Sequence, residues 1–213
     1  MVVAHVPNTG TMATCWAPGA PVQLSHSDDP RRKLAWTLER VDMGGGWVGV
    51  HTGRPNAVVA EAVAAGSIPA VAGFREVRRE VVFALPGQER GRLDLGLYAG
   101  QTADTLVEIK NCTLLAGDCL RFPDAVSLRG RKHLGLLATA LTQGYRAVML
   151  FALNRPEGTR FAPAWGVDPV YARRLAEVAA LGVEVLAVRL RHTQDGLEVG
   201  DGVAVDLAEG GAD

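Results

Sequence analysis

Two acidic residues and a lysine lie in neighbouring stretches that have the apolar pattern of β-strands: Asp94 in one, Glu108 and Lys110 in the next. Because side chains alternate between the faces of a strand, Glu108 and Lys110 share a face, and a hairpin brings Asp94 beside them. Two carboxylates can hold Mg²⁺ or Mn²⁺, which neutralises developing phosphate charge. A lysine beside the cation can orient the attacking water. The pattern indicates phosphodiester hydrolysis, with these three residues as the catalytic group.

A purely structural interpretation also fits the same residues. Glu108 and Lys110 could form a salt bridge on an exposed face, since Glu-x-Lys occurs often by chance. The aspartate at hairpin distance favours the catalytic interpretation. So does the scarcity of lysine, because only three of the 22 basic residues are lysines, Lys33, Lys110 and Lys132. A position that keeps lysine can require a compact ammonium that arginine does not supply.

The elements around the triplet predict an α/β domain over residues 54–213. A helix at 56–65, with Asn56 as N-cap and Gly66 as its stop, precedes a meander of three strands. Helices and strands then alternate, and Asp168 with Pro169 opens the last helix. This order predicts a mixed sheet with helices on its faces. The strands are expected at 77–85, 92–98, 105–114, 146–153 and 183–190, and a further helix at 129–143.

Residues 1–53 predict a separate β domain, as a small barrel or an open sheet, because short apolar stretches alternate with turn-rich segments. The far end of the chain, 195–213, holds six acidic residues and no basic ones. Without it the net charge of −1 becomes +5, from 22 basic and 17 acidic residues. An acidic tail on a mildly basic body is compatible with a polyanionic partner, although composition alone favours a tail that only aids solubility.

Composition excludes several classes of protein. Apolar residues make up 48% of the 213 residues and charged residues 21%, as in a globular protein and unlike a disordered one. The longest strongly apolar run is far shorter than a membrane helix requires, and no signal peptide is recognised. The three cysteines, Cys15, Cys112 and Cys119, form no CxxC pair and are expected to be free thiols. We therefore expect a cytoplasmic protein.

Several short blocks resemble the sugar fermentation stimulation protein family, in the same order along nearly the whole chain. The blocks lie at 5–10, 18–20, 24–33, 54–56, 78–80, 107–114, 122–125 and 129–134. The resemblance implies a prokaryotic protein with an OB-like N-terminal domain, a C-terminal domain similar to PD-(D/E)XK nucleases, DNA binding and a link to maltose metabolism. It implies that Asp94 and Glu108 bind metal and that Glu108 and Lys110 are the (D/E)xK pair. The preceding helix of such folds often adds an acid, here Glu61, which could equally be an ordinary exposed glutamate.

Two basic clusters are candidates for nucleic-acid binding. Cations in the first turn of a helix oppose its dipole, so a bound phosphate would offset their cost; side chains extended into solvent are the alternative. A second basic run precedes Trp36 and suits a single-strand stacking groove, although a charged loop beside a core tryptophan fits as well. The first cluster comprises Arg129, Arg131, Lys132 and His133, and the second Arg31, Arg32 and Lys33.

Three functions remain open at this stage. The first is a Mg²⁺- or Mn²⁺-dependent nuclease acting on DNA or RNA, and the second a non-catalytic DNA-binding regulator. The third is an OB-type module that binds sugars or a protein. No membrane partner is expected, and self-association as a homodimer is left open. Family members usually begin some tens of residues earlier, so we also expect the β domain to lack its first strand and a longer chain to be more stable.

Overall fold

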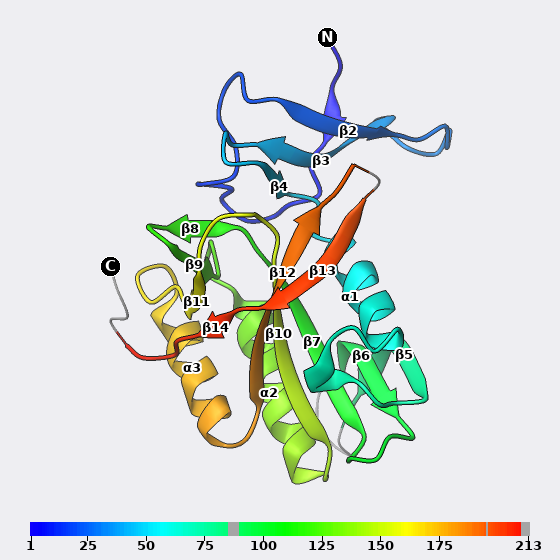
Figure 1. Ribbon diagram of the computed structural model, residues 1–213, viewed down its shortest axis with the longest axis vertical. Coiled ribbons are helices and arrows are strands. Elements are labelled where there is room, and N and C mark those ends of the chain that lie inside the picture. Colours follow the sequence, from blue (N-terminus) through cyan, green and yellow to red (C-terminus); the bar gives the residue numbers. More distant parts are fainter. Residues whose placement is uncertain (85–89, 195, 210–213) are drawn as a thin grey trace.

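The computed structural model describes residues 1–84, 90–194 and 196–209. A small N-terminal sheet sits on one end of a larger α/β domain (Figure 1). Its strands run in the order β1–β3–β2, with β4 also paired to β3, so residues 1–53 form an open sheet and not a closed barrel. The strands are β1 (Ala4–His5), β2 (Val22–His26), β3 (Trp36–Asp42) and β4 (Trp47–Gly49).

The α/β domain is built on a six-stranded mixed sheet in the order β13–β12–β10–β7–β6–β5. Strands β5, β6 and β7 form the predicted antiparallel meander, while β7, β10 and β12 are parallel and β13 closes one edge antiparallel. Leu85, the last residue of the first predicted strand, lies outside the described residues. The strands are β5 (Glu76–Phe83), β6 (Gly91–Tyr98), β7 (Thr105–Cys112), β10 (Arg146–Leu153), β12 (Glu184–His192) and β13 (Leu197–Gly202).

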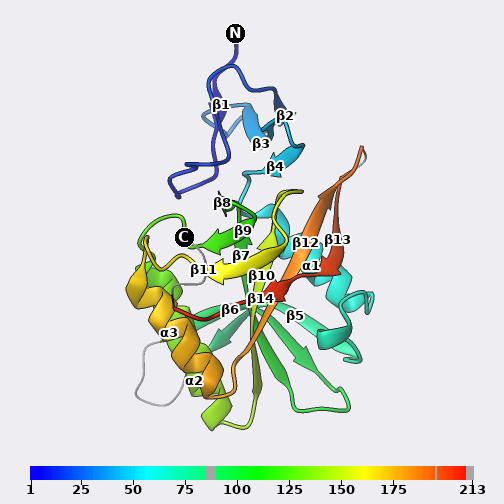
Figure 2. The same ribbon diagram turned by 60° about the vertical axis from the view of Figure 1, so that its left-hand side comes forward.

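Helices cover both faces of this sheet, as parallel strands require. Helices α2 (Leu128–Thr142) and α3 (Pro169–Ala180) make the crossovers on one face, and α1 (Arg54–Ala64) with the short 3₁₀ helix η1 (Pro69–Val71) covers the other (Figure 2). Every residue of β10 after Arg146 is buried, because the strand lies in the centre between these layers. The predicted helix-on-sheet architecture is confirmed.

The N-termini of the helices can be compared with the capping residues that the sequence predicts. Asp168 caps α3 by accepting a hydrogen bond from the Tyr171 amide, and Pro169 follows in the first turn, as predicted. Ser127 caps α2. The prediction that Asn56 caps α1 is wrong: the cap is Gly53, and Asn56 lies inside the helix. Its side chain bonds to a carboxylate on the sheet, so it serves tertiary structure and not the helix end.

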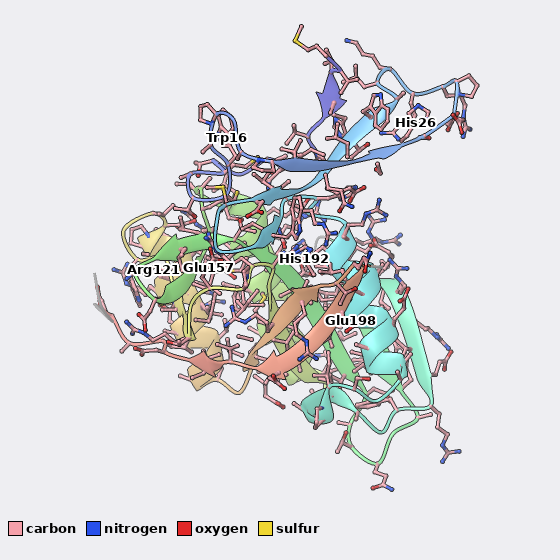
Figure 3. The ribbon with its side chains drawn as sticks, turned by 45° about the horizontal axis from the view of Figure 1, so that its top comes forward. Trp16, His26, Arg121, Glu157, His192 and Glu198 are labelled. Atoms are coloured by element: carbon pink, nitrogen blue, oxygen red, sulfur yellow. The ribbon has the colours of Figure 1, made fainter. Side chains whose placement is uncertain are left out.

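The end of the chain is not the free acidic tail that the sequence predicts. Residues 197–205 supply β13 to the large sheet and β14 to a second sheet of order β14–β11–β9–β8. Glu198 lies on β13 with an exposed side chain (Figure 3). Asp195 and Asp213 lie outside the described residues. The strands of the second sheet are β8 (Leu114–Ala116), β9 (Cys119–Phe122), β11 (Arg160–Pro163) and β14 (Ala204–Val205).

Two expectations from composition can be compared with the structure. Cys15, Cys112 and Cys119 are free thiols, as predicted, and all three are buried. Within the part of the chain that the structure describes, no helix is both long and apolar enough to cross a bilayer.

Candidate active site

The first element of the site is the point where strands β6 and β7 separate. Their backbone pairing ends at Leu95 and Val107. Beyond it, the Asp94 Oδ2 atom accepts a 2.7 Å hydrogen bond from the Ile109 amide, so a carboxylate takes the place of a main-chain acceptor. Its Oδ1 atom accepts a 2.7 Å bond from Asn56 Nδ2 on α1. Asp94 is thus fixed between the helix and the diverging strands.

Glu108 and Lys110 share one face of β7, as predicted, and a histidine joins them from α2. The Lys110 ammonium and the His133 Nδ1 atom both contact Glu108 Oε1. Glu108 Oε2 is buried and has no hydrogen-bond partner among the residues that the structure describes. The side chains of Glu108 and Lys110 are only 2% and 14% exposed, so their ion pair is not the solvent-exposed bridge of the alternative interpretation.

The two carboxylates differ in their electrostatics. Burial, reinforced by the negative charge of Glu108, raises the pKa of Asp94 to about 6. Burial also acts to raise the pKa of Glu108. The hydrogen bond from His133 and the positive charge of Lys110 outweigh it, however, and hold that pKa below its ordinary value. Above pH 6 the site therefore carries two buried negative charges, which favours a cation between them.

Both parts of the protein line the cavity that contains these residues. It has a volume of about 360 Å³. The N-terminal part supplies Asn8, Thr9 and Gly10, and a Cβ added to Gly10 would lie 2.1 Å from Asp124 Oδ2. The α/β domain supplies Asn56, Asp94, Glu108, Ile109, Lys110, Asn111, Thr113, Leu114 and residues 121–127 and 129, and Thr52 joins from the connecting segment. The N-terminal segment therefore forms a wall of the site.

The donor set fits a hard divalent cation. Asp94 and Glu108 offer carboxylate oxygens in one polar cavity, and the unpartnered Oε2 of Glu108 is a buried acceptor that a cation would satisfy. Among the described residues no group of three or more His, Cys, Asp or Glu is arranged to hold a metal. Two carboxylates suit Mg²⁺, which keeps several of its waters, better than a metal that needs a full protein cage.

Glu61 does not join the two carboxylates. It lies five residues after Asn56, about 140° around the helix, and its side chain is exposed while Val59, Ala60 and Val63 are buried. The expectation that α1 adds a metal-binding acid is therefore corrected. The residue that α1 turns into the cavity is Asn56.

The four residues of the basic cluster at the start of α2 have different surroundings in the structure. Arg129 is exposed and lines the cavity. Arg131 donates a 2.6 Å bond to the fully buried Asp168 and ties α2 to α3. Lys132 is exposed. His133 is buried against Glu108 and does not extend toward solvent, so its expected contact with a phosphate is corrected.

The second basic cluster lies in the loop between β2 and β3, outside the cavity. Arg31 pairs with Asp29 at 2.8 Å, and Arg32 donates a 2.5 Å bond to Thr37 Oγ1. Lys33 is exposed. Trp36 packs edge-on against His26, with ring centroids 4.6 Å apart. The structure does not bring this loop together with Asp94, Glu108 and Lys110.

Sequence reasoning did not give Asn56 and His133 their roles at the carboxylates. It also did not single out Arg121 of β9 (labelled in Figure 3), which is 8% exposed and lines the cavity. The blocks that carried the family resemblance were the available signal. Five of them, at 5–10, 54–56, 107–114, 122–125 and 129–134, supply residues of the cavity wall. They are distant in sequence and converge only in the fold.

Fold and site together define a class of protein: an OB-type module joined to a mixed α/β domain with a buried carboxylate–lysine site. Residues 2–50 match the SfsA N-terminal OB domain, and residues 53–196 match the sugar fermentation stimulation protein RE domain. The chain belongs to the sugar fermentation stimulation protein family.

Relatives of similar length support this membership. A sugar fermentation stimulation protein homolog from Acidithiobacillus ferrooxidans is 45% identical over 92% of this chain and 83% of its own. One from Paramagnetospirillum magneticum is 43% identical over 98% of this chain and 86% of its own. The solved structure of Pyrococcus furiosus SfsA in complex with Ca²⁺ has the same fold, with a TM-score of 0.82 at 24% identity, over 95% of this chain and 85% of that one.

Proposed function

We propose that this protein is a nuclease that uses Mg²⁺ or Mn²⁺ to hydrolyse phosphodiester bonds of DNA or RNA. The observation that carries the proposal is the pairing of the Asp94 and Glu108 carboxylates with Lys110 in one cavity, with Glu108 Oε2 buried and unpartnered. A buried acceptor without a donor is costly unless a ligand completes it.

Each residue has a defined task in this proposal. Asp94 and Glu108 hold the cation, which when bound supplies positive charge for the phosphate and lowers the pKa of a water. Lys110, fixed by Glu108, orients the attacking water and stabilises charge on the phosphate. Arg129 at the cavity wall binds a neighbouring phosphate of the strand. Asn8, Thr9 and Gly10 shield one side of the cavity from water.

The binding of Ca²⁺ by the Pyrococcus furiosus protein supports the choice of a hard, oxygen-liganded cation. Ca²⁺, Mg²⁺ and Mn²⁺ are therefore the ions to compare here.

The proposal is tested by cleavage of labelled single- and double-stranded DNA and RNA with Mg²⁺ or Mn²⁺. We expect wild type to cut and Glu108→Gln to lose about 10³-fold in rate, because a carboxylate that acts in the transition state is lost. Glu61→Gln makes the same chemical change on the exposed face of α1 and should cut like wild type. Equal cutting by wild type and Glu108→Gln contradicts the proposal.

A non-catalytic DNA-binding regulator is the second candidate. The absence of a third carboxylate or histidine ligand among the described residues favours it. Two carboxylates facing DNA repel it unless a cation intervenes. If the protein is such a regulator, Glu108→Gln should bind DNA as well as or better than wild type in a salt-controlled titration. Neither protein should then cut.

A further inference from the structure

We propose that His133 is a positioning residue, which holds one oxygen of Glu108 so that the other faces the divalent cation. The inference rests on the proposed metal-dependent function and assigns His133 a place in it.

The two oxygens of the Glu108 carboxylate have different surroundings. Oε1 is contacted by both Lys110 Nζ and His133 Nδ1, whereas Oε2 is buried without a partner. An ionised carboxylate can only accept hydrogen bonds, so Nδ1 carries the proton and donates it. The 3.4 Å between Lys110 Nζ and His133 Nδ1 is then the spacing of two donors that meet at one acceptor.

This convergence is difficult to explain by stability alone. A buried carboxylate is most stable when both of its oxygens are hydrogen-bonded, and an unpaired buried acceptor is costly. Here the described part of the chain directs two donors to one oxygen and none to the other. The geometry suits a carboxylate whose second oxygen is kept for a ligand that the chain does not contain.

The imidazole is presented from a fixed helix. Ser127 caps α2 and donates its amide to Asp168 Oδ2 at 2.9 Å, and Arg131 bonds to the same carboxylate. A Cβ added to Gly130 would lie 2.9 Å from the Tyr171 ring, so the first turn packs closely on α3. His133, 5% exposed, follows on this anchored turn. Groups that orient metal ligands act best from such rigid elements.

The test is calorimetric titration of the full-length protein with Mn²⁺, without nucleic acid. His133→Leu should weaken Mn²⁺ binding 10–100-fold, the usual effect of losing a group that orients a ligand. His133→Asn should restore most of the affinity, because its amide nitrogen lies near the position of Nδ1. Leu134→Ala, a fully buried neighbour on the same helix, should lower the unfolding temperature and leave Mn²⁺ affinity unchanged. With nucleic acid, His133→Leu should lower kcat and leave KM unchanged.

A folded His133→Leu protein with wild-type Mn²⁺ affinity overturns this inference and leaves the proposed function intact. Wild-type protein that binds no Mn²⁺ overturns both. His133→Gln serves where His133→Leu does not fold, because its longer chain carries the amide past the Nδ1 position. It should bind Mn²⁺ more weakly than His133→Asn, and equal binding by those two variants overturns the inference.

Discussion

Replacing Asp94 with asparagine is expected to stabilise the metal-free protein at pH 8 by about 2–3 kcal/mol, and to abolish the proposed cleavage. The two effects have one cause. Asp94 is held in a buried position where its negative charge is costly, with its pKa raised to about 6 by burial and by the charge of Glu108. Asparagine removes the charge and with it a ligand for the cation.

The hydrogen bonds of Asp94 can survive this substitution. The asparagine carbonyl can still accept from the Ile109 amide, and its NH₂ group can donate to Asn56 once the Asn56 amide is flipped. The stabilisation therefore reflects charge. In the unfolded chain Asp94 ionises near its ordinary pKa of 3.8, and in the folded protein near 6. The destabilisation by the Asp94 charge is thus fully present above pH 6. It shrinks as the pH falls from 6 to 3.8 and is absent below 3.8.

Chemical denaturation with EDTA at pH 8, 6 and 4 measures this dependence. The advantage of Asp94→Asn over wild type should be largest at pH 8 and vanish near pH 4. Asp201→Asn makes the same change at an exposed carboxylate of β13 and should stay within about 0.5 kcal/mol of wild type at pH 8. An Asp94→Asn protein that is less stable than wild type at pH 8 would show that the buried charge is compensated.

The position of Asp94 also explains why the sequence could locate this candidate site. An acid in an otherwise apolar strand requires a reason, and alternation alone placed Glu108 and Lys110 on one face. Local rules likewise located the Asp168 cap of α3 and the meander, because each depends on residues close together in the chain.

Other features depended on partners that no local pattern specifies. Strands β8, β9, β11 and β14 have two to four residues each, too few to show a period. The pairings of β11 with β9 and with β14 also join distant segments of the chain. Asn56 is of a residue type that often caps helices, but its side-chain amide donates a hydrogen bond to Asp94. His133 follows three basic residues and so resembles part of a phosphate-binding cluster. In the structure its position on α2 directs its side chain to Glu108. Only the packing of the helix decides between those roles.

Contacts between residues distant in the sequence also hold the N-terminal segment in place, and the Arg155 side chain makes one of them. Its side chain is 3% exposed. One nitrogen donates to the carbonyls of Thr14, at 3.0 Å, and Thr113, at 2.8 Å, while the other two bind Glu157 at 2.9 Å each. A second polar connection joins the parts at His192, which lies at the end of β12 (Figure 3). Its ring nitrogens contact Asn154 Oδ1 at 2.9 Å and Arg40 Nη1 at 3.4 Å.

Arg155→Met is therefore expected to lower the free energy of unfolding by about 3 kcal/mol. It removes the guanidinium donor from the carbonyls of Thr14 and Thr113 and from the partly buried carboxylate of Glu157, and among the described residues the Thr113 carbonyl then keeps only the Thr14 hydroxyl at 3.3 Å. Arg174→Ala provides the control, because its pair with Glu177 is about half exposed and should be worth no more than about 0.5 kcal/mol. Urea denaturation followed by tryptophan fluorescence measures both, and equal losses would contradict the role given to Arg155.

Thr14 lies four residues beyond Gly10 in the segment that walls the cavity, and Thr113 three residues beyond Lys110. Loss of Arg155 should for this reason also reduce cleavage in protein that is still folded, because the N-terminal wall would be held less firmly, by the remaining bonds of Thr11, Met12 and Thr14.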